Sequence, residues 1–456
     1  MKERILLFLI VLGLTAFIYI FQSYTTWGLA ILVSLMSIYA LFTNIAYKIK
    51  QRQNRKSPQV KNEDYKPFVS IMIPAHNEET VIANTIRTVL SMDYPNFEII
   101  AIDDRSTDNT ASVLKELEKE YPNKVIAFIR PKDAFPGKSA VLNDALAFAK
   151  GEAILVFDAD ATMEPDFLTN LVYELEPKDV GAVQARKIVR NKDVNLLTRC
   201  QNNEMTMDTH FQVGRDSIKG AVELRGNGEL IKRAALEDIG GWNNYTITDD
   251  LDMSTRLHIK GWDVRFCKDT AVYEEGIMYL CPLYKQRRRW LEGTIRRYLE
   301  YFWDILSSKK MSMRARLDMI AYISQFIMPA WFIIEIGIFL AKILLKGATP
   351  NTLMSSCIMG CIIGLGFFTA CRYSLRRYDN LPRTDAFIQA VYTSVYLLII
   401  WFPLVLFIGT KILFMKKDMN WGKTAHGLVQ HEHAIQKAKE KIKKAKEELK
   451  KLLIAK

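Results

Sequence analysis

The sequence has few of the residues that build disulfide frameworks and zinc clusters. Its 456 residues include only six cysteines and no CxxC pair. Three of the cysteines fall in or at the edge of one apolar run, where a thiol behaves as a small hydrophobic group. We therefore expect free thiols and neither a zinc site nor disulfide bonds. The cysteines are Cys200, Cys267, Cys281, Cys357, Cys361 and Cys371.

Two further absences limit the classes of protein. No GxGxxG follows the first expected strand, which weakens the case for a dinucleotide-binding site. The N-terminus begins like a signal peptide, but no small-residue cleavage site follows it and a second apolar run comes directly after. We therefore expect this segment to be retained in the membrane.

The positive charge is concentrated next to apolar segments. A net charge of +12 would suit either nucleic acid or an anionic membrane. Lysine and arginine cluster beside the apolar runs and in the C-terminal tail, so we expect membrane lipids and no nucleic acid as partners.

Five apolar runs are candidates for membrane spans: residues 5–21, 27–46, 317–345, 352–371 and 387–414. The basic cluster at 48–56 predicts a cytoplasmic location for the polar region that follows. Five crossings would place the lysine-rich C-terminus outside, against the same rule. We expect Pro403 to break the last run into a hairpin or a re-entrant piece, which gives four or six crossings.

The region between residues 66 and 304 alternates apolar, β-branched runs with helical patterns. The runs are 68–73, 97–102, 124–129 and 153–157, and the helices between them begin near Glu79, Asn109 and Gly137. This alternation predicts a parallel α/β sheet. Ligands of such sheets bind where loops leave the carboxyl ends of the strands.

Acidic motifs follow two of these strands. Asp158 and Asp160 form a DxD pair after the fourth strand, and carboxylates are the ligands that Mg²⁺ or Mn²⁺ shares with substrate phosphates. Asp103 and Asp104 follow the second strand. Either pair could instead close a turn or cap a helix. Lys138, at a helix start, is either a phosphate ligand or a solvated lysine.

Two later motifs suggest where transfer chemistry occurs. Thr248-Asp-Asp250 precedes a helical pattern, so one carboxylate could cap that helix while the other serves as a general base. Gln286-Arg-Arg-Arg-Trp290 combines guanidinium groups for a diphosphate with an indole that can stack on a sugar. Basic, tryptophan-bearing helices also lie on membrane surfaces without a catalytic role.

Together these motifs resemble the membrane-bound family 2 glycosyltransferases that carry QxxRW, the group of cellulose, hyaluronan, chitin and poly-N-acetylglucosamine synthases. The stretch 251–262 is also similar to that of cyanobacterial diacylglycerol glucosyltransferases. The resemblance implies a GT-A fold, a Rossmann-like α/β domain that binds a nucleotide sugar, inserted between N-terminal and C-terminal transmembrane helices. It also implies inversion at the anomeric carbon.

The resemblance assigns roles residue by residue. Asp250 becomes the catalytic base, and Asp249 stands where glutamate is usual. The nucleotide sugar would be bound by Pro74, His76, Glu78, Asp104, Lys138, Asp158, Gln286 and Arg289. The acceptor would be bound by Gln184, Arg186, Gly226, Asn227, Gly228, Glu229, Asp249 and Trp290. A Mg²⁺ or Mn²⁺ cofactor would be held by Asp158 and Asp160.

We divide the chain accordingly into two transmembrane helices (1–47), a basic linker (48–66), a GT-A domain (67–283), the QxxRW and interfacial helices (284–315), C-terminal transmembrane segments (316–414) and a cytoplasmic tail (415–456). In the tail, Trp421-Gly-Lys-Thr424 resembles a gating segment, or is an interfacial tryptophan. The amphipathic pattern beyond His433 suits a homo-oligomer contact, a helix on anionic lipid, or a solvated tail.

The expected activity is that of a metal-dependent hexosyltransferase in the cell membrane, with its catalytic domain in the cytoplasm. It would move glucose or N-acetylglucosamine from a UDP-sugar donor to a growing polysaccharide. The alternative is a glycolipid synthase that transfers glucose from UDP-glucose to diacylglycerol, so the acceptor is a glycan or a lipid.

Overall fold

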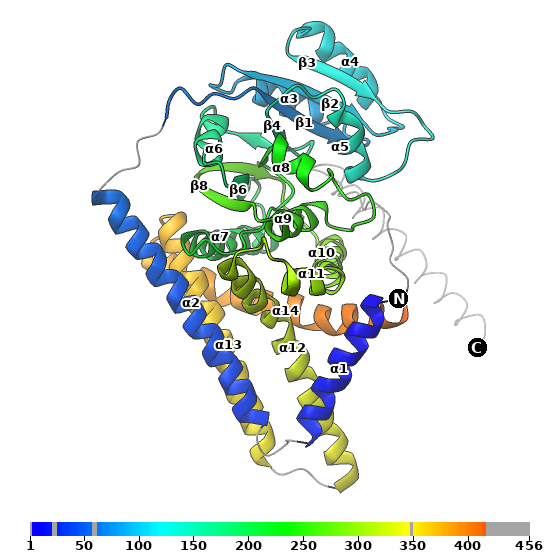
Figure 1. The fold of residues 1–456 in the computed structure, drawn as a ribbon. Coiled ribbons are helices and arrows are strands. Elements are labelled where there is room, and N and C mark those ends of the chain that lie inside the picture. Colours follow the sequence, from blue (N-terminus) through cyan, green and yellow to red (C-terminus); the bar gives the residue numbers. More distant parts are fainter. Residues whose placement is uncertain (1, 21–24, 57–61, 347–349, 416–456) are drawn as a thin grey trace, which may run out of the picture.

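The computed structural model describes residues 2–20, 25–56, 62–346 and 350–415. An α/β domain occupies one end of the molecule, and long helices extend from its opposite side (Figure 1). The domain contains an eight-stranded sheet of order β3-β2-β1-β4-β7-β6-β8-β5. The expected gating segment and the amphipathic pattern beyond His433 lie outside the described residues.

The first half of the sheet matches the expectation from the sequence. Strands β1 (Val69–Ala75), β2 (Phe97–Asp103), β3 (Val125–Ile129) and β4 (Ala153–Val156) are mutually parallel where they pair. Helices α3 (Ile82–Leu90), α4 (Thr110–Glu120) and α5 (Lys138–Leu146) connect them. Strands β1, β2 and β4 are buried on both faces, as continuous apolar runs require.

The second half of the sheet is mixed. Strand β7 (Glu229–Lys232) is antiparallel to both β4 and β6 (Val180–Val189), and β8 (Asp263–Glu274) is parallel to β6. The short β5 (Thr162–Met163) closes the edge against β8. Helices α6 (Phe167–Leu175), α8 (Arg233–Asp238) and α9 (Asp249–Lys260) belong to this half. The sheet is therefore all-parallel in the part that the sequence pattern predicted, and mixed in the rest.

A layer of helices separates the sheet from the long helices (Figure 1). It contains α7 (Leu196–Ser217), α10 (Leu280–Glu300) and α11 (Phe302–Ser307). Helix α7 begins with a capping box, in which Asn195 accepts from the Thr198 N–H and the Thr198 hydroxyl accepts from the Asn195 N–H. The QRRRW motif lies within α10, on the side of the domain that faces the long helices.

Four helices point away from the domain: α1 (Lys2–Ile20), α2 (Thr25–Lys56), α12 (Met313–Lys346) and α13 (Pro350–Tyr378) (Figure 1). Helix α2 continues through the basic cluster at 48–56. Large apolar side chains are exposed along these helices, for example Phe8, Leu12, Leu41 and Leu344. Exposed apolar surface of this extent is typical of contact with lipid.

Helix α14 (Arg383–Phe414) corrects our expectation for the last apolar run. It is one continuous helix of 32 residues with Pro403 inside it, and not a hairpin. Proline costs a helix about 3 kcal/mol or more. Leu397, Ile400, Leu404 and Ile408 form one buried stripe on both sides of the proline, so packing holds the helix together.

Helix α14 lies across the other long helices, next to the domain (Figure 1). It contacts α7 and α10 as well as α1, α12 and α13. Among the described residues, α1 and α14 are the two helices long and apolar enough to cross a membrane.

The described cysteines agree with the expectation of free thiols: Cys200, Cys267, Cys281, Cys361 and Cys371 are unpaired with one another.

Candidate active site

The loops that follow β1 and β2 form one joined structure. Pro74 pairs in register with Ile102 near the ends of the two strands. His76 Nδ1 lies 2.6 Å from the Asp104 carbonyl oxygen, and the Glu78 N–H donates to the Thr110 hydroxyl at 2.8 Å. These contacts bring the predicted residues of the nucleoside site together. An open pocket beside them is lined by His76, Arg105, Ser106, Thr107 and Lys132.

Asp104 is buried under two arginines. Its carboxylate accepts from Arg130 Nη1 at 2.5 Å and from Arg105 Nε at 2.8 Å and Nη2 at 2.9 Å. Arg130 also donates to Asp144 at 2.6 Å. These guanidinium groups fix the loop that carries Asp104, and direct contact of its carboxylate with uridine stays a prediction. Sequence reasoning missed Arg130, which no motif marks.

The DxD pair lies beside a lysine at the end of β4. Lys138 Nζ donates to Asp158 Oδ1 at 2.6 Å and to the Gly226 carbonyl at 2.8 Å. Burial opposes ionisation of Asp158, but the charges of Lys138, Lys187 and Arg289 hold its pKa below the usual value. Three cations therefore act on this position, as expected where a diphosphate is to be bound. Lys187, which sequence reasoning missed, reaches Glu274 at 2.6 Å.

The residues of the DxD pair fit a divalent cation that arrives with a nucleotide. Asp160 Oδ2 accepts from the Glu275 N–H at 3.3 Å, and the side chain of Asp158 is 41% exposed. Within the described part of the chain, no group of three or more His, Cys, Asp or Glu side chains is arranged to hold a metal. Mg²⁺ typically binds through one or two carboxylates and completes its octahedron with phosphate and water. Two carboxylates at a strand end match that pattern.

Asp250 sits in the first turn of α9, where the sequence placed a general base. Its Oδ1 accepts from the Leu251 N–H at 2.8 Å, so it caps the helix start while Oδ2 faces the Gly226 loop. Burial and the charge of Asp249 raise its pKa to about 6, although the Leu251 N–H, Lys138 and Arg225 act against the rise. A carboxylate with such a pKa is a stronger base than ordinary aspartate and is still ionised near neutral pH.

Two further acids lie near Asp250. Glu229 accepts from the Gly226 N–H at 3.2 Å. Burial and the charges of Asp250 and Asp249 raise the pKa of Glu229 to about 8. Glu229 is therefore largely protonated at neutral pH and leaves the negative charge to Asp250 and Asp249. Asp249 Oδ2 is buried without a hydrogen-bond partner among the described residues.

Hydrogen bonds fix several of the residues predicted to bind the acceptor. Gln184 is fully buried, accepts from the Arg225 N–H at 2.7 Å and donates to the Asn227 carbonyl at 2.9 Å. Asn227 in turn accepts from the Asp158 N–H, which joins this loop to the DxD pair. Gly228 donates its N–H to the Val156 carbonyl at the end of β4. The four-residue segment 226–229 is thus fixed against the donor site.

Arg186 points elsewhere. Its guanidinium pairs with Asp379 and donates to the Tyr378 carbonyl at 3.1 Å, in the connection between α13 and α14. Asp379 also accepts from the Thr206 hydroxyl at 2.9 Å. In this arrangement Arg186 fastens the sheet to the long helices, and its predicted contact with the acceptor remains untested.

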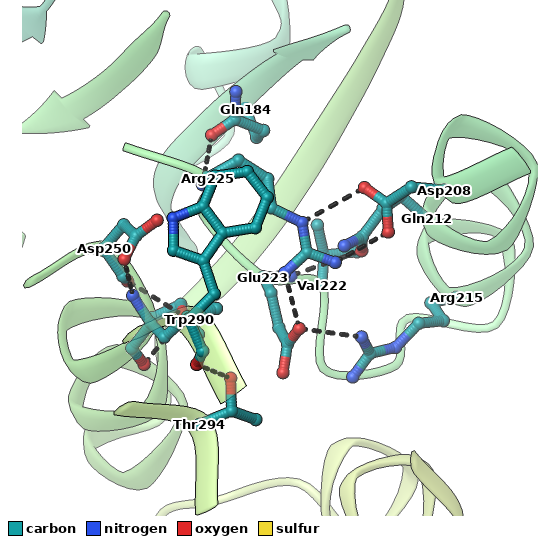
Figure 2. A network of polar contacts seen from close by, with 12 residues as sticks. Gln184, Asp208, Gln212, Arg215, Val222, Glu223, Arg225, Asp250, Trp290 and Thr294 are labelled. Carbon is teal, nitrogen blue, oxygen red and sulfur yellow. Dashed lines mark hydrogen bonds and ion pairs between the residues drawn. The ribbon is translucent and has the colours of Figure 1, made fainter. Parts of the chain in front are cut away.

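Arg225 is a site residue that sequence reasoning missed. Asp208 holds its guanidinium through Nε at 3.1 Å and Nη2 at 2.7 Å, and Glu223 accepts from Nη1 at 2.8 Å (Figure 2). It is close enough to Asp250 to lower the pKa of that carboxyl. The only signal in the sequence is its position directly before Gly226-Asn-Gly228. One partner, Glu223, is two residues away, but the other, Asp208, comes from α7 and could not be inferred locally.

Close packing brings the QRRRW helix to Asp250. A Cβ added at Gly293 would lie 2.4 Å from Thr248 Cγ2, so only glycine lets α10 approach the start of α9 this closely. The indole of Trp290 extends from α10 toward the region of Asp250 and Arg225 (Figure 2). Arg289 is near enough to Asp158 to act on its pKa. The predicted base and the predicted donor and acceptor contacts thus share one site.

The middle of the motif has a different role. Arg287 is buried, donates Nη1 to Gln286 Oε1 at 2.7 Å and Nη2 to Glu204 Oε2 at 2.8 Å. Its guanidinium carbon lies 4.1 Å from the centre of the Trp290 ring. Arg287 therefore contacts both ends of the motif, Gln286 and Trp290, and anchors them to α7 through Glu204.

Comparisons with known proteins identify the family of this chain. Residues 67–293 match the model of the family described as "Glycosyltransferase like family 2", a range that includes every motif from the first strand through Trp290. The chain is 37% identical over 378 residues to a beta-monoglucosyldiacylglycerol synthase of Nostoc sp., covering 79% of this chain and 76% of that protein. A poly-beta-1,6-N-acetyl-D-glucosamine synthase of Staphylococcus epidermidis is 30% identical over 283 residues, covering 61% of this chain and 67% of that protein.

A solved structure supports the fold. A mannosyltransferase from Pyrobaculum calidifontis in complex with GDP-Man and Mn²⁺ superposes with a TM-score of 0.54 at 19% identity, covering 81% of this chain and 99% of that one. The predicted GT-A fold is confirmed. The match of residues 67–293 to the family model and the 37% identity to the glucosyldiacylglycerol synthase show that this chain belongs to the family 2 glycosyltransferases.

Proposed function

We propose that this enzyme transfers glucose from UDP-glucose to diacylglycerol at a membrane surface. The observation that carries this proposal is the extent of the similarity. The match to the glucosyldiacylglycerol synthase covers 378 residues, well beyond the 227 residues of the family model, whereas the match to the polymer synthase covers 283. From the sequence we ranked a polysaccharide acceptor first, and we now rank the lipid acceptor first.

The transfer is a single displacement. The acceptor oxygen attacks the anomeric carbon from the face opposite UDP, so a new C–O bond forms as the bond to the phosphate oxygen breaks and the configuration inverts. Asp250 accepts the hydroxyl proton as the oxygen attacks. UDP departs with the bonding electron pair and a growing negative charge.

Cationic side chains stabilise that charge. Lys138 lies on the DxD pair, and Arg289 and Lys187 act on the same position, so a diphosphate bound there meets three cations. Asp158 and Asp160 would hold a divalent ion, which when bound neutralises diphosphate charge. The ion pair between Lys138 and Asp158 also keeps the lysine directed at the site before the donor binds.

The acceptor reaches the site from the membrane side. Trp290 and Arg225 face the same region as Asp250, on the side of the domain from which the long helices extend (Figures 1 and 2). We place those helices in the cell membrane and the domain in the cytoplasm. Supporting this orientation, the basic residues at 48–56 and at Arg372, Arg376 and Arg377 lie at the ends of α2 and α13 next to the domain.

A growing polysaccharide is the second candidate acceptor. The 30% identity to the poly-beta-1,6-N-acetyl-D-glucosamine synthase over 283 residues favours it. A stacking tryptophan beside the base suits a glycan end as well as a lipid glycerol.

Product analysis separates the two. Membranes containing the enzyme are incubated with UDP-[¹⁴C]glucose or UDP-[¹⁴C]N-acetylglucosamine, with membranes that lack it as the control. The proposal predicts label from UDP-glucose in a chloroform-soluble lipid that depends on added diacylglycerol. Label in an ethanol-insoluble polymer would support the second candidate, and no label from either donor would count against both.

A further inference from the structure

Glu204 on α7 makes hydrogen bonds to both α10, which carries the QRRRW motif, and α14. Its carboxylate accepts from three donors: Arg287 Nη2 at 2.8 Å and the Tyr396 hydroxyl at 3.0 Å on Oε2, and Trp401 Nε1 at 2.9 Å on Oε1. Arg287 belongs to α10, whereas Tyr396 and Trp401 belong to α14. One acid therefore links the QRRRW helix to the helix that crosses the others.

Arg287 carries this link to the acceptor side. It donates to Gln286 and stacks on Trp290, and it is the largest fully buried side chain of its helix together with Arg297. A guanidinium without its carboxylate would be a buried, unpaired charge. The position of Arg287, and through it that of the Trp290 indole, thus depends on Glu204.

Helix α14 has a second face. Opposite the buried stripe that packs on α7 and α10, it exposes apolar side chains at helical spacing, namely Ile388, Val391, Val395, Ile399 and Leu406. An apolar face of this kind on a helix that lies across the others suits the boundary between headgroups and acyl chains. The same helix therefore contacts lipid on one side and Glu204 on the other.

We propose that Glu204 is a positioning residue that couples the seating of α14 to the acceptor side of the active site, through Arg287 and Trp290. With α14 in the position seen here, Tyr396 and Trp401 donate to the Glu204 carboxylate and fix it. Glu204 in turn holds Arg287 against the Trp290 indole. With α14 displaced, Glu204 loses two donors and the indole loses its support. The inference rests on the proposed function only in taking Trp290 as an acceptor contact.

The interaction is not explained by stability alone. Other polar contacts already join α7 to α14 and α10 to α14, such as Asn203 to the Thr393 hydroxyl at 2.9 Å and Lys411 to Glu292. Those contacts touch neither Gln286 nor Trp290 in the described structure. Glu204 is distinguished by reaching the motif, so its loss should act on acceptor use and not equally on both substrates.

The test compares conservative variants by steady-state kinetics in vesicles. Glu204→Gln keeps the shape but removes the charge. The double variant Tyr396→Phe/Trp401→Phe removes both α14 donors, a hydroxyl and an indole N–H, the latter together with part of the Trp401 ring. Thr410→Ala on α14, whose hydroxyl donates to the Leu406 carbonyl, is the matched control. The wild type is assayed first, so that a failure to glucosylate diacylglycerol is recognised as failure of the proposed function.

We expect the acceptor KM to rise about tenfold in both test variants, while the KM for UDP-glucose and the binding of UDP stay within about twofold of the wild type. Combining Glu204→Gln with the double variant should add little, because the two changes act along one path. Thr410→Ala should match the wild type.

An unchanged acceptor KM, or an equal rise for both substrates, would overturn the proposal. Fully additive effects in the combined variant would also overturn it. If Glu204→Gln fails to fold, the Tyr396→Phe/Trp401→Phe variant carries the same test, since it leaves the Glu204 and Arg287 ion pair in place.

Discussion

The carboxylate of Asp250 lies 3.1 Å from the position that a Cβ would take at Gly226. Gly226 also has a φ of +78°, a conformation that side chains other than glycine rarely adopt. A glycine in this loop is therefore what permits the base to face the acceptor floor.

Gly226→Ala should remove most activity with limited loss of structure. The added methyl group meets Asp250 Oδ2 and strains the loop, so we expect kcat to fall by at least about tenfold, whereas the strain costs about 1–3 kcal/mol of stability. Initial rates and thermal unfolding measured on the same preparation check this. Gly240→Ala, which has open space around its Cβ position and a similar φ of +78°, controls for backbone strain alone. Equal losses of activity in the two variants would contradict the steric account.

The rate should depend on pH through Asp250. Its pKa is raised to about 6, so the fraction that can accept a proton falls as pH drops through that value. We expect kcat/KM to be nearly level above pH 7 and to fall about tenfold per pH unit below 6. A rate profile from pH 5 to 8 in saturating divalent cation measures this. A rate that stays level down to pH 5 would show that the base is not this carboxyl.

The raised pKa of Asp250 also predicts how the stability of the folded protein changes with pH. A carboxyl whose folded pKa is raised binds more protons in the folded state, so its protonated form favours folding, and that contribution is lost as pH rises from about 4 to 6. Asp250→Asn, which cannot ionise, should therefore unfold at an equal or higher temperature than the wild type at pH 7.5. A clearly lower Tm for this variant would argue against an ionised Asp250 whose burial and repulsion by Asp249 destabilise the folded state.

Removing divalent cations should stop the reaction. Asp158 and Asp160 fit an ion shared with the diphosphate, and Lys138 alone leaves that charge incompletely neutralised. We expect EDTA to abolish transfer and added Mg²⁺ or Mn²⁺ to restore it. A zinc-selective chelator serves as the control and should leave transfer unchanged. Undiminished turnover in EDTA would remove the metal from the mechanism.

Arg225 should affect the acceptor more than the donor. Its guanidinium is held by Asp208 and Glu223 beside Asp250, with Trp290 facing the same region. We expect Arg225→Lys, which cannot make the paired contacts with Asp208, to raise the acceptor KM several-fold, roughly 1 kcal/mol in binding, and to change UDP affinity little. A change confined to UDP affinity would place Arg225 on the donor side instead.

The sequence predicted those parts of the fold that have local signals. Strands β1 to β4 are apolar runs bounded by turns and could be located. Acidic motifs follow β2 and β4, which is why the sequence predicts a donor site at this edge. The mixed half of the sheet could not be predicted, because β5 has two residues, β7 has four, and β6 pairs with a strand about eighty residues later. Such pairing leaves no periodic pattern in a single sequence.

The missed residues share one property: each has a partner that is distant in the sequence. Arg225 is held by Asp208, Arg287 by Glu204, and Lys187 by Glu274. None of these pairs follows helical or strand spacing. The last helix was misjudged for a related reason: Pro403 was expected to break it, and only its packing against α7 and α10, which are distant in the sequence, shows why it stays continuous.

The most direct test of the account compares the wild type with Asp250→Asn in vesicles that contain diacylglycerol and UDP-[¹⁴C]glucose. The account predicts labelled glucolipid from the wild type, a loss of about 10²-fold or more in the variant, and unchanged UDP binding in both. Near-normal transfer of label by Asp250→Asn would contradict the assignment of the base and, with it, the mechanism built on this site.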